Sequence, residues 1–97
     1  MRVIAKKTLH EFWDREPGAK AALEAWYAEA KHAQWKSPTD IQARYAHASI
    51  VNNERVVFNI GGNKYRLVVA VSYTAGIVLI KFVGTHNDYD KINVETV

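Results

Sequence analysis

Two basic residues in the second half of this 97-residue chain have types and spacing that could do chemistry. Lys64 and Arg66 alternate within a stretch rich in Val, Leu and Tyr, so in a strand both side chains leave the same face, roughly 7 Å apart. A central strand does not need two cations on one face for packing. They suit an anionic partner, although the simpler interpretation is that both lie near a solvated strand end.

A histidine, a phenol and a carboxylate follow the last expected strand. His86, Tyr89 and Asp90 are three and four residues apart, so they share a side if the chain makes a helical turn here. Thr85 and Asp88 have the spacing of a cap for such a turn. Histidine titrates near neutrality and is the usual general acid or base, whereas an exposed polar turn with a solvated His86 is the alternative.

Lys81 is a third cation in an expected strand, bordered by Ile80 and Phe82. It would complete a cationic patch with Lys64 and Arg66 if the strand register places it beside them. Sequence alone does not decide that register.

Other chemical motifs fail on spacing or composition. The four histidines are scattered without metal-ligand spacing, and the absence of cysteine removes thiolate zinc sites and thiol nucleophiles. Gly61 and Gly62 precede Asn63 and Lys64, but no Ser or Thr follows the lysine and a strand is expected after it, so this is a turn and not a phosphate loop. We expect no metal and no cofactor.

Helices are expected in the N-terminal half, after a short β-branched strand over residues 2–5. Thr8 and Glu11 have capping-box spacing and predict the start of the first helix. Residues 17–18 break that helix and begin a second. Its apolar residues have the spacing of one buried helix face: Ala19, Ala22, Leu23, Trp26, Tyr27 and Ala30.

Pro38 after Ser37 predicts the first position of a short third helix. We expect Trp13 and Trp26 in the core. Trp35 lies at a helix end, where partial exposure is expected.

After residues 52–53 the apolar residues recur at every second position, as in a β-strand. Strands are expected over residues 55–60, 64–72 and 77–83, and tight turns between them predict an antiparallel meander. The helices cannot bury their apolar stripes alone, so they must pack on one face of this sheet. The predicted fold class is α+β.

Composition limits the class of protein further. Hydrophobic residues are 48% and charged residues 24%, as in packed soluble domains, and the apolar runs are shorter than a signal peptide or a membrane span requires. The absence of cysteine favours a reducing compartment. A net charge of +3 is compatible with an anionic partner. We expect one cytoplasmic domain over residues 1–97 that does not enter a membrane.

Several short segments between residue 2 and residue 92 identify a protein family more specifically in combination than any one of them does alone. They are Arg2-Val3-Ile4-Ala5, Phe12-Trp13, Ala25-Trp26-Tyr27, residues 55–60, 63–69 and 81–86, and Tyr89-Asp90-Lys91-Ile92. In this combination the chain resembles the HigB toxins of bacterial type II toxin–antitoxin systems.

The resemblance implies a RelE-like fold, in which two to three N-terminal helices pack on a twisted antiparallel sheet. Such toxins are mRNA interferases that often cleave mRNA on the ribosome. The resemblance also implies a HigA-type helix-turn-helix antitoxin as the partner, with operator DNA bound only through the toxin–antitoxin complex.

Metal-independent RNA cleavage turns the 2′-hydroxyl onto the adjacent phosphate, so it needs a base, an acid and cations for the phosphorane. By the resemblance, Arg66 matches the sheet arginine that contacts the scissile phosphate, and its planar fork suits that task. Lys64 would add positive charge. His86 would carry a proton, and Tyr89 would stack on a base or contact a hydroxyl.

Further residues are predicted to position the RNA: Arg55, Asn63, Lys81 and Lys91. Glu54 is a weaker candidate base, because it lies in a turn. Two other classes of function stay open, namely a toxin of the ParE group that inhibits DNA gyrase and a non-catalytic module that binds RNA or the ribosome. The acid–base set favours the nuclease, since an inhibitor has no use for it.

Overall fold

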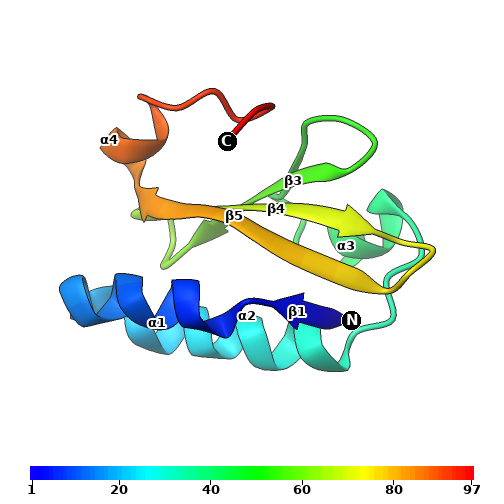
Figure 1. Cartoon of the computed structure of the whole chain (residues 1–97), viewed down its shortest axis with the longest axis horizontal. Helices are drawn as coiled ribbons and strands as arrows, with labels where there is room; N and C mark the ends of the chain where they lie inside the picture. The colour runs from blue at the N-terminus through cyan, green and yellow to red at the C-terminus, as the bar shows by residue number, and fades with distance from the viewer.

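The chain folds into a five-stranded sheet with two long helices along one face, as the computed structural model of residues 1–97 shows (Figure 1). The strands are β1 (Arg2–Ile4), β2 (Ser49–Ile50), β3 (Arg55–Ile60), β4 (Tyr65–Ser72) and β5 (Ile77–Thr85). The helices are α1 (Lys6–Arg15), α2 (Lys20–His32), α3 (Pro38–Arg44) and α4 (His86–Tyr89), with a 3-10 turn over Pro17–Ala19 before α2. The predicted α+β class is confirmed.

The strand order is β1-β5-β4-β3-β2, and β2 to β5 pair antiparallel in sequence order. This confirms the predicted meander. The first strand departs from the expected antiparallel sheet, because β1 pairs with β5 in parallel, from Arg2 opposite Ile77 to Ile4 opposite Leu79. A parallel neighbour requires a long crossover, and the helices together with the meander supply one.

The helix-covered face of the sheet carries the core. Along β4 the residues Tyr65, Leu67, Val69 and Val71 belong to an 18-residue buried cluster together with Leu9 and Trp13 of α1 and Leu23 and Trp26 of α2. The alternation of strand residues therefore leaves Arg66 and Ala70 on the opposite face, which neither α1 nor α2 covers (Figure 1).

Phe58 of β3 is the centre of the aromatic packing. Its ring centroid lies 5.4 Å from that of Trp26, 5.1 Å from that of Tyr45 and 6.1 Å from that of Trp35. Trp35 is only 6% exposed, so the expected partial exposure is wrong. The reason is the stacking on Phe58, which a residue beyond the end of α2 can reach because the chain turns back toward the sheet there.

The helix starts agree with the sequence except at α1. The structure begins α1 at Lys6, with Ala5 as a cap residue that makes no side-chain bond, so the predicted Thr8–Glu11 capping box is wrong. β1 leads directly into this helix, which places Thr8 inside its first turn. Pro38 opens α3 as predicted. None of the helices has the length and apolar character needed to cross a bilayer.

Removal of the Phe58 ring is expected to be the costlier of two truncations. Phe58 is 1% exposed, so Phe58→Ala should lower the free energy of unfolding by about 3–5 kcal/mol. Urea denaturation measures this loss. Leu79→Ala, at a residue that is 40% exposed, is the control and should cost about 1 kcal/mol or less. Equal losses in the two variants would contradict this description of the core.

Candidate active site

The start of β4 and the end of β5 bring three of the predicted site residues onto neighbouring segments, namely Lys64, Arg66 and His86. Tyr65 pairs with Thr85, and Arg66 pairs with Gly84. Directly beyond this pairing, the backbone amide of His86 donates a hydrogen bond of 3.1 Å to the carbonyl of Lys64. Lys64, Arg66 and His86 therefore lie on two adjacent chain segments at one end of the sheet.

Arg66 is half-buried, and its guanidinium is held by the turn that precedes it. Nη1 donates to the carbonyl oxygens of Asn63 at 3.2 Å and Tyr65 at 3.3 Å, and Nη2 donates to Oδ1 of Asn63 at 3.3 Å. These contacts orient the planar group, while its remaining N–H donors stay available. Asn63, predicted to position RNA, contacts Arg66 in this structure.

The turn that carries His86 is capped on both sides. Thr85 Oγ1 accepts from the amide of Asp88 at 3.1 Å, and Asp88 Oδ2 accepts from the amide of Thr85 at 3.2 Å, so the predicted cap is present. The hydrogen bonds from Thr85 hold the pKa of Asp88 below its ordinary value, and the nearby charges of Lys91 and Arg15 lower it further. The four-residue helix α4 is thereby fixed at the end of β5.

His86 and Asp90 form a pair on α4. His86 Nδ1 lies 3.3 Å from Asp90 Oδ2, and both side chains are about half-exposed. When the ring is protonated, this distance makes the two side chains an ion pair, and Nε2 is the ring nitrogen that Asp90 does not contact. Tyr89 is half-buried, and its hydroxyl makes no hydrogen bond within the chain. The predicted shared side of His86 and Asp90 is confirmed.

Gly84 lets α4 and β5 approach each other closely beside Arg66. It is buried, and a Cβ added there would lie 2.6 Å from Cζ of Phe82 and 3.0 Å from Cβ of Asp88. A side chain at this position would have to displace an aromatic ring and the capping residue. The sequence pattern of a glycine near a strand end did not indicate this role by itself.

Arg55 and Glu54 lie at the other end of β3 from Asn59, the partner of Arg66. Arg55 is 9% exposed, and its Nη1 donates to the carbonyl of Val97 at 2.6 Å. Its position is four residues from Asn59, or roughly 13 Å along the strand. The structure does not bring Arg55 or Glu54 beside Arg66.

A bulge in β5 displaces Lys81. Val68 pairs with Phe82 and Val69 with Ile80, which leaves Lys81 as the extra residue without a partner across the ladder. Lys81 is exposed and lies three residues before Gly84, the partner of Arg66, or roughly 10 Å along the strand. The register therefore does not place Lys81 directly opposite Arg66 or Lys64.

Three polar residues near the site were not among those predicted from the sequence as site residues. Asn59 is exposed on β3 directly opposite Arg66, and strand parity could have indicated it. Asp90 was predicted to share a side with His86 but was assigned no role, and it lies 3.3 Å from the His86 ring. The charge of Arg15 at the end of α1 helps to lower the pKa of Asp88, which no local pattern could show because the two residues lie on distant segments.

A family model described as HigB toxin, the RelE-like toxic component of a toxin–antitoxin system, matches residues 19–92 of the chain. The mRNA interferase HigB of Escherichia coli O6:H1 is 22% identical over 94 residues, which are 95% of this chain and 91% of that protein. The mRNA interferase toxin HigB of Escherichia coli K12 is 28% identical over 92 residues, which are 93% of this chain and 88% of that protein. An mRNA interferase HigB of Shigella flexneri is similar to the same extent.

The cap of α4 should respond to pH with a definite sign. Because the pKa of Asp88 in the folded chain is below its ordinary 3.8, its stabilisation of α4 is complete above about pH 3.8 and is lost as the pH falls through the lowered value. Thr85→Ala removes the side-chain hydrogen bond but keeps the backbone amide, which is the larger cause, so it should raise the pKa of Asp88 only part of the way toward 3.8. An NMR titration of the Asp88 carboxyl carbon measures this, with Thr74→Ala in the exposed β4–β5 turn as the control. An unchanged pKa in Thr85→Ala would contradict the capping.

Proposed function

The chain belongs to the HigB family of RelE-like toxins, and from this membership and the geometry around Arg66 we propose that it is an mRNA interferase that inhibits translation. The observation that carries the proposal is the β4–β5 register, which holds an oriented guanidinium next to the segment that bears a histidine. The curated relatives bear the name mRNA interferase, which supports the same substrate class.

In the proposed reaction, the 2′-hydroxyl of one nucleotide attacks the adjacent phosphorus. The bond from O2′ to phosphorus forms and the bond from phosphorus to O5′ breaks, which gives a 2′,3′-cyclic phosphate and a 5′-hydroxyl. One proton leaves O2′ and one is delivered to O5′, so the charge that must be stabilised lies on the non-bridging oxygens of the phosphorane.

Arg66 supplies the stabilisation of that phosphorane. Its fork is already oriented by Asn63, so little reorganisation is needed when a phosphate arrives. Lys64 is exposed one residue before β4 and adds positive charge. Neither role requires a metal or a cofactor.

His86 carries a proton through Nε2, and Asp90 is a positioning residue that holds the ring through Nδ1. Tyr89 has a free hydroxyl on the same short helix and is the candidate for the second hydroxyl contact or for stacking on a base. Lys91 and Asn63 lie near this group and position RNA. Arg55 and Lys81 lie farther away, so any contact they make is with other nucleotides.

Partners follow from the same proposal. The family implies an antitoxin, and we propose one of the HigA helix-turn-helix type, through which alone operator DNA is bound. The side chains of His86 and Asp90 are half-exposed, so these two residues do not enclose a bound RNA. This exposure favours cleavage on the ribosome, because the ribosome itself would hold the mRNA in place. A toxin that cleaves mRNA on the ribosome acts in the cytoplasm.

Two substitutions of Arg66 should separate the effect of its positive charge on cleavage from the effect of its planar guanidinium. Arg66→Ala should reduce the cleavage rate by about 100-fold or more, and Arg66→Lys should retain only part of it because a lysine lacks the planar fork. Primer extension on mRNA after controlled expression measures cutting, with Lys7→Ala on α1 as the control. Growth arrest with uncut mRNA and failing DNA supercoiling in the wild type would instead support the gyrase inhibitor.

Substitution of Asp90 tests the positioning of the histidine. His86→Ala should reduce the rate by about 10²–10⁴-fold, and Asp90→Asn by about tenfold, because an amide can donate to Nδ1 and favour the other tautomer. The ¹⁵N shifts of the His86 ring report the tautomer. A matched control exists on α1, where His10 Nδ1 lies 3.2 Å from Asp14 Oδ2. Asp14→Asn should leave cleavage unchanged, and an equal effect of both variants would contradict the role of Asp90.

A further inference from the structure

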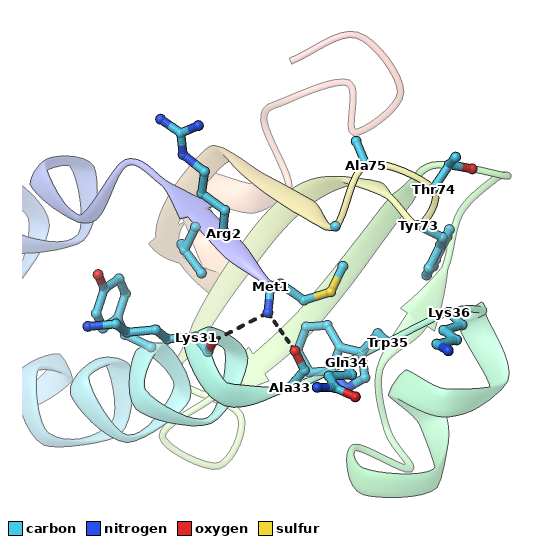
Figure 2. Close-up of a pocket in the computed structure, with 13 residues that line it drawn as sticks. Met1, Arg2, Lys31, Ala33, Gln34, Trp35, Lys36, Tyr73, Thr74 and Ala75 are labelled. Carbon is cyan, nitrogen blue, oxygen red and sulfur yellow. Dashed lines mark hydrogen bonds between the residues drawn. The ribbon is translucent and has the colours of Figure 1, made fainter.

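A cavity lies at the opposite end of the sheet from Arg66 and His86. It measures about 680 Å³ and is bounded by β1, the end of α2 with the segment that follows, and the turn between β4 and β5 (Figure 2). The turn begins after Ser72, six residues from Arg66 along β4, so the cavity lies roughly 20 Å from the proposed active site. The mechanism above makes no use of it.

Three cations line the cavity, namely Arg2, Lys31 and Lys36. None of the thirteen lining residues is acidic, and none of these three cations takes part in an ion pair within the chain. Glu29, two residues before Lys31, is occupied by Arg44 and by the hydroxyl of Tyr45 at 2.7 Å. The rim therefore carries three cations without a salt-bridge partner, and one carboxylate lies beside it, since Asp40 accepts from the backbone amide of Lys36 at 2.9 Å.

The interior of the cavity is largely apolar. Trp35 lies at its floor with only 6% of its surface exposed, and Tyr73 lines the cavity as well (Figure 2). Tyr27 is a third aromatic residue of the lining. The amino group of Met1 donates to the carbonyl oxygens of Lys31 and Ala33, which satisfies acceptors at the end of α2 within the cavity wall. An apolar hollow of this volume accommodates one or two large side chains.

The basic rim and the apolar floor of the cavity together favour a polypeptide over a nucleic acid as the ligand. A nucleic acid offers phosphate charge to the rim and bases that can stack on exposed rings, but Trp35 is only 6% exposed and already stacks on Phe58, so it has little open face for a base. A peptide segment with a large apolar side chain flanked by carboxylates offers negative charge to the rim and an apolar group to the floor. The family supplies a protein partner, because its members are the toxic components of toxin–antitoxin systems.

We propose that this cavity is the docking site of an acidic segment of the antitoxin, with one large apolar side chain of that segment inserted against Trp35. The inference rests on the family membership and not on the cleavage mechanism. Since the cavity is remote from Arg66, the contact anchors the antitoxin without itself covering the active site. Docking there and access of RNA to the active site are thus separable.

The experiment uses calorimetry at two salt concentrations to measure the dissociation constant between the full chain and its cognate antitoxin. Lys31→Glu and Arg2→Glu should each weaken binding by about tenfold, and the loss should shrink at the higher salt concentration. Lys20→Glu, an exposed position at the other end of α2, is the matched control and should change binding by less than about twofold.

RNA cleavage is measured with the same variants, so that a failure of the proposed docking site can be told from a failure of the proposed function. Retained cleavage with weakened antitoxin binding supports the proposal, and it also shows that the variants fold. Unchanged antitoxin binding in both charge reversals overturns it. A loss of RNA binding with unchanged antitoxin affinity overturns it in favour of a nucleic acid site. If the wild type cuts no RNA while the reversals still weaken antitoxin binding, the function proposed above fails and the docking site stands.

Discussion

The register between β4 and β5 is the constraint on which the rest of the structure depends. The pairing of Arg66 with Gly84, continued by the hydrogen bond from His86 to the carbonyl of Lys64, decides which polar side chains meet. A slip of one residue would turn every side chain of a strand to the other face. Arg66 would then point into the core beneath the helices, and the face that neither α1 nor α2 covers would lose its guanidinium.

The core makes this register unique, because the buried face tolerates only apolar side chains. Phe58 lies in contact with Trp26 and Tyr45, which joins β3 to α2 and to the chain after α3 in one aromatic cluster. With α1 and α2 on one face, the short helix α4 is on the other (Figure 1). Its mutual cap between Thr85 and Asp88 substitutes for the packing that a four-residue helix cannot provide.

Local patterns predicted what local interactions determine. The alternation over residues 55–60 gave the bounds of β3, and the spacing of Thr85 and Asp88 gave the cap of α4. A single sequence does not predict contacts between distant segments. The parallel pairing of β1, the bulge at Lys81 and the bond from Arg55 to Val97 each depend on where another segment lies. Local patterns thus indicated the turn that holds His86 and Asp90, but not that this turn lies beside Lys64 and Arg66.

The most direct test of the account concerns the chemistry of the cut itself. A message that the wild-type toxin cleaves on translating ribosomes is prepared with a single 2′-deoxynucleotide on the 5′ side of the cut, and the ends are identified by mass spectrometry. We predict a 2′,3′-cyclic phosphate or 3′-phosphate with a 5′-hydroxyl from the all-ribose message, and no cut at the deoxy position. Cleavage at the deoxy position, or a 5′-phosphate on the product, would contradict the proposed attack by the 2′-hydroxyl at Arg66 and His86.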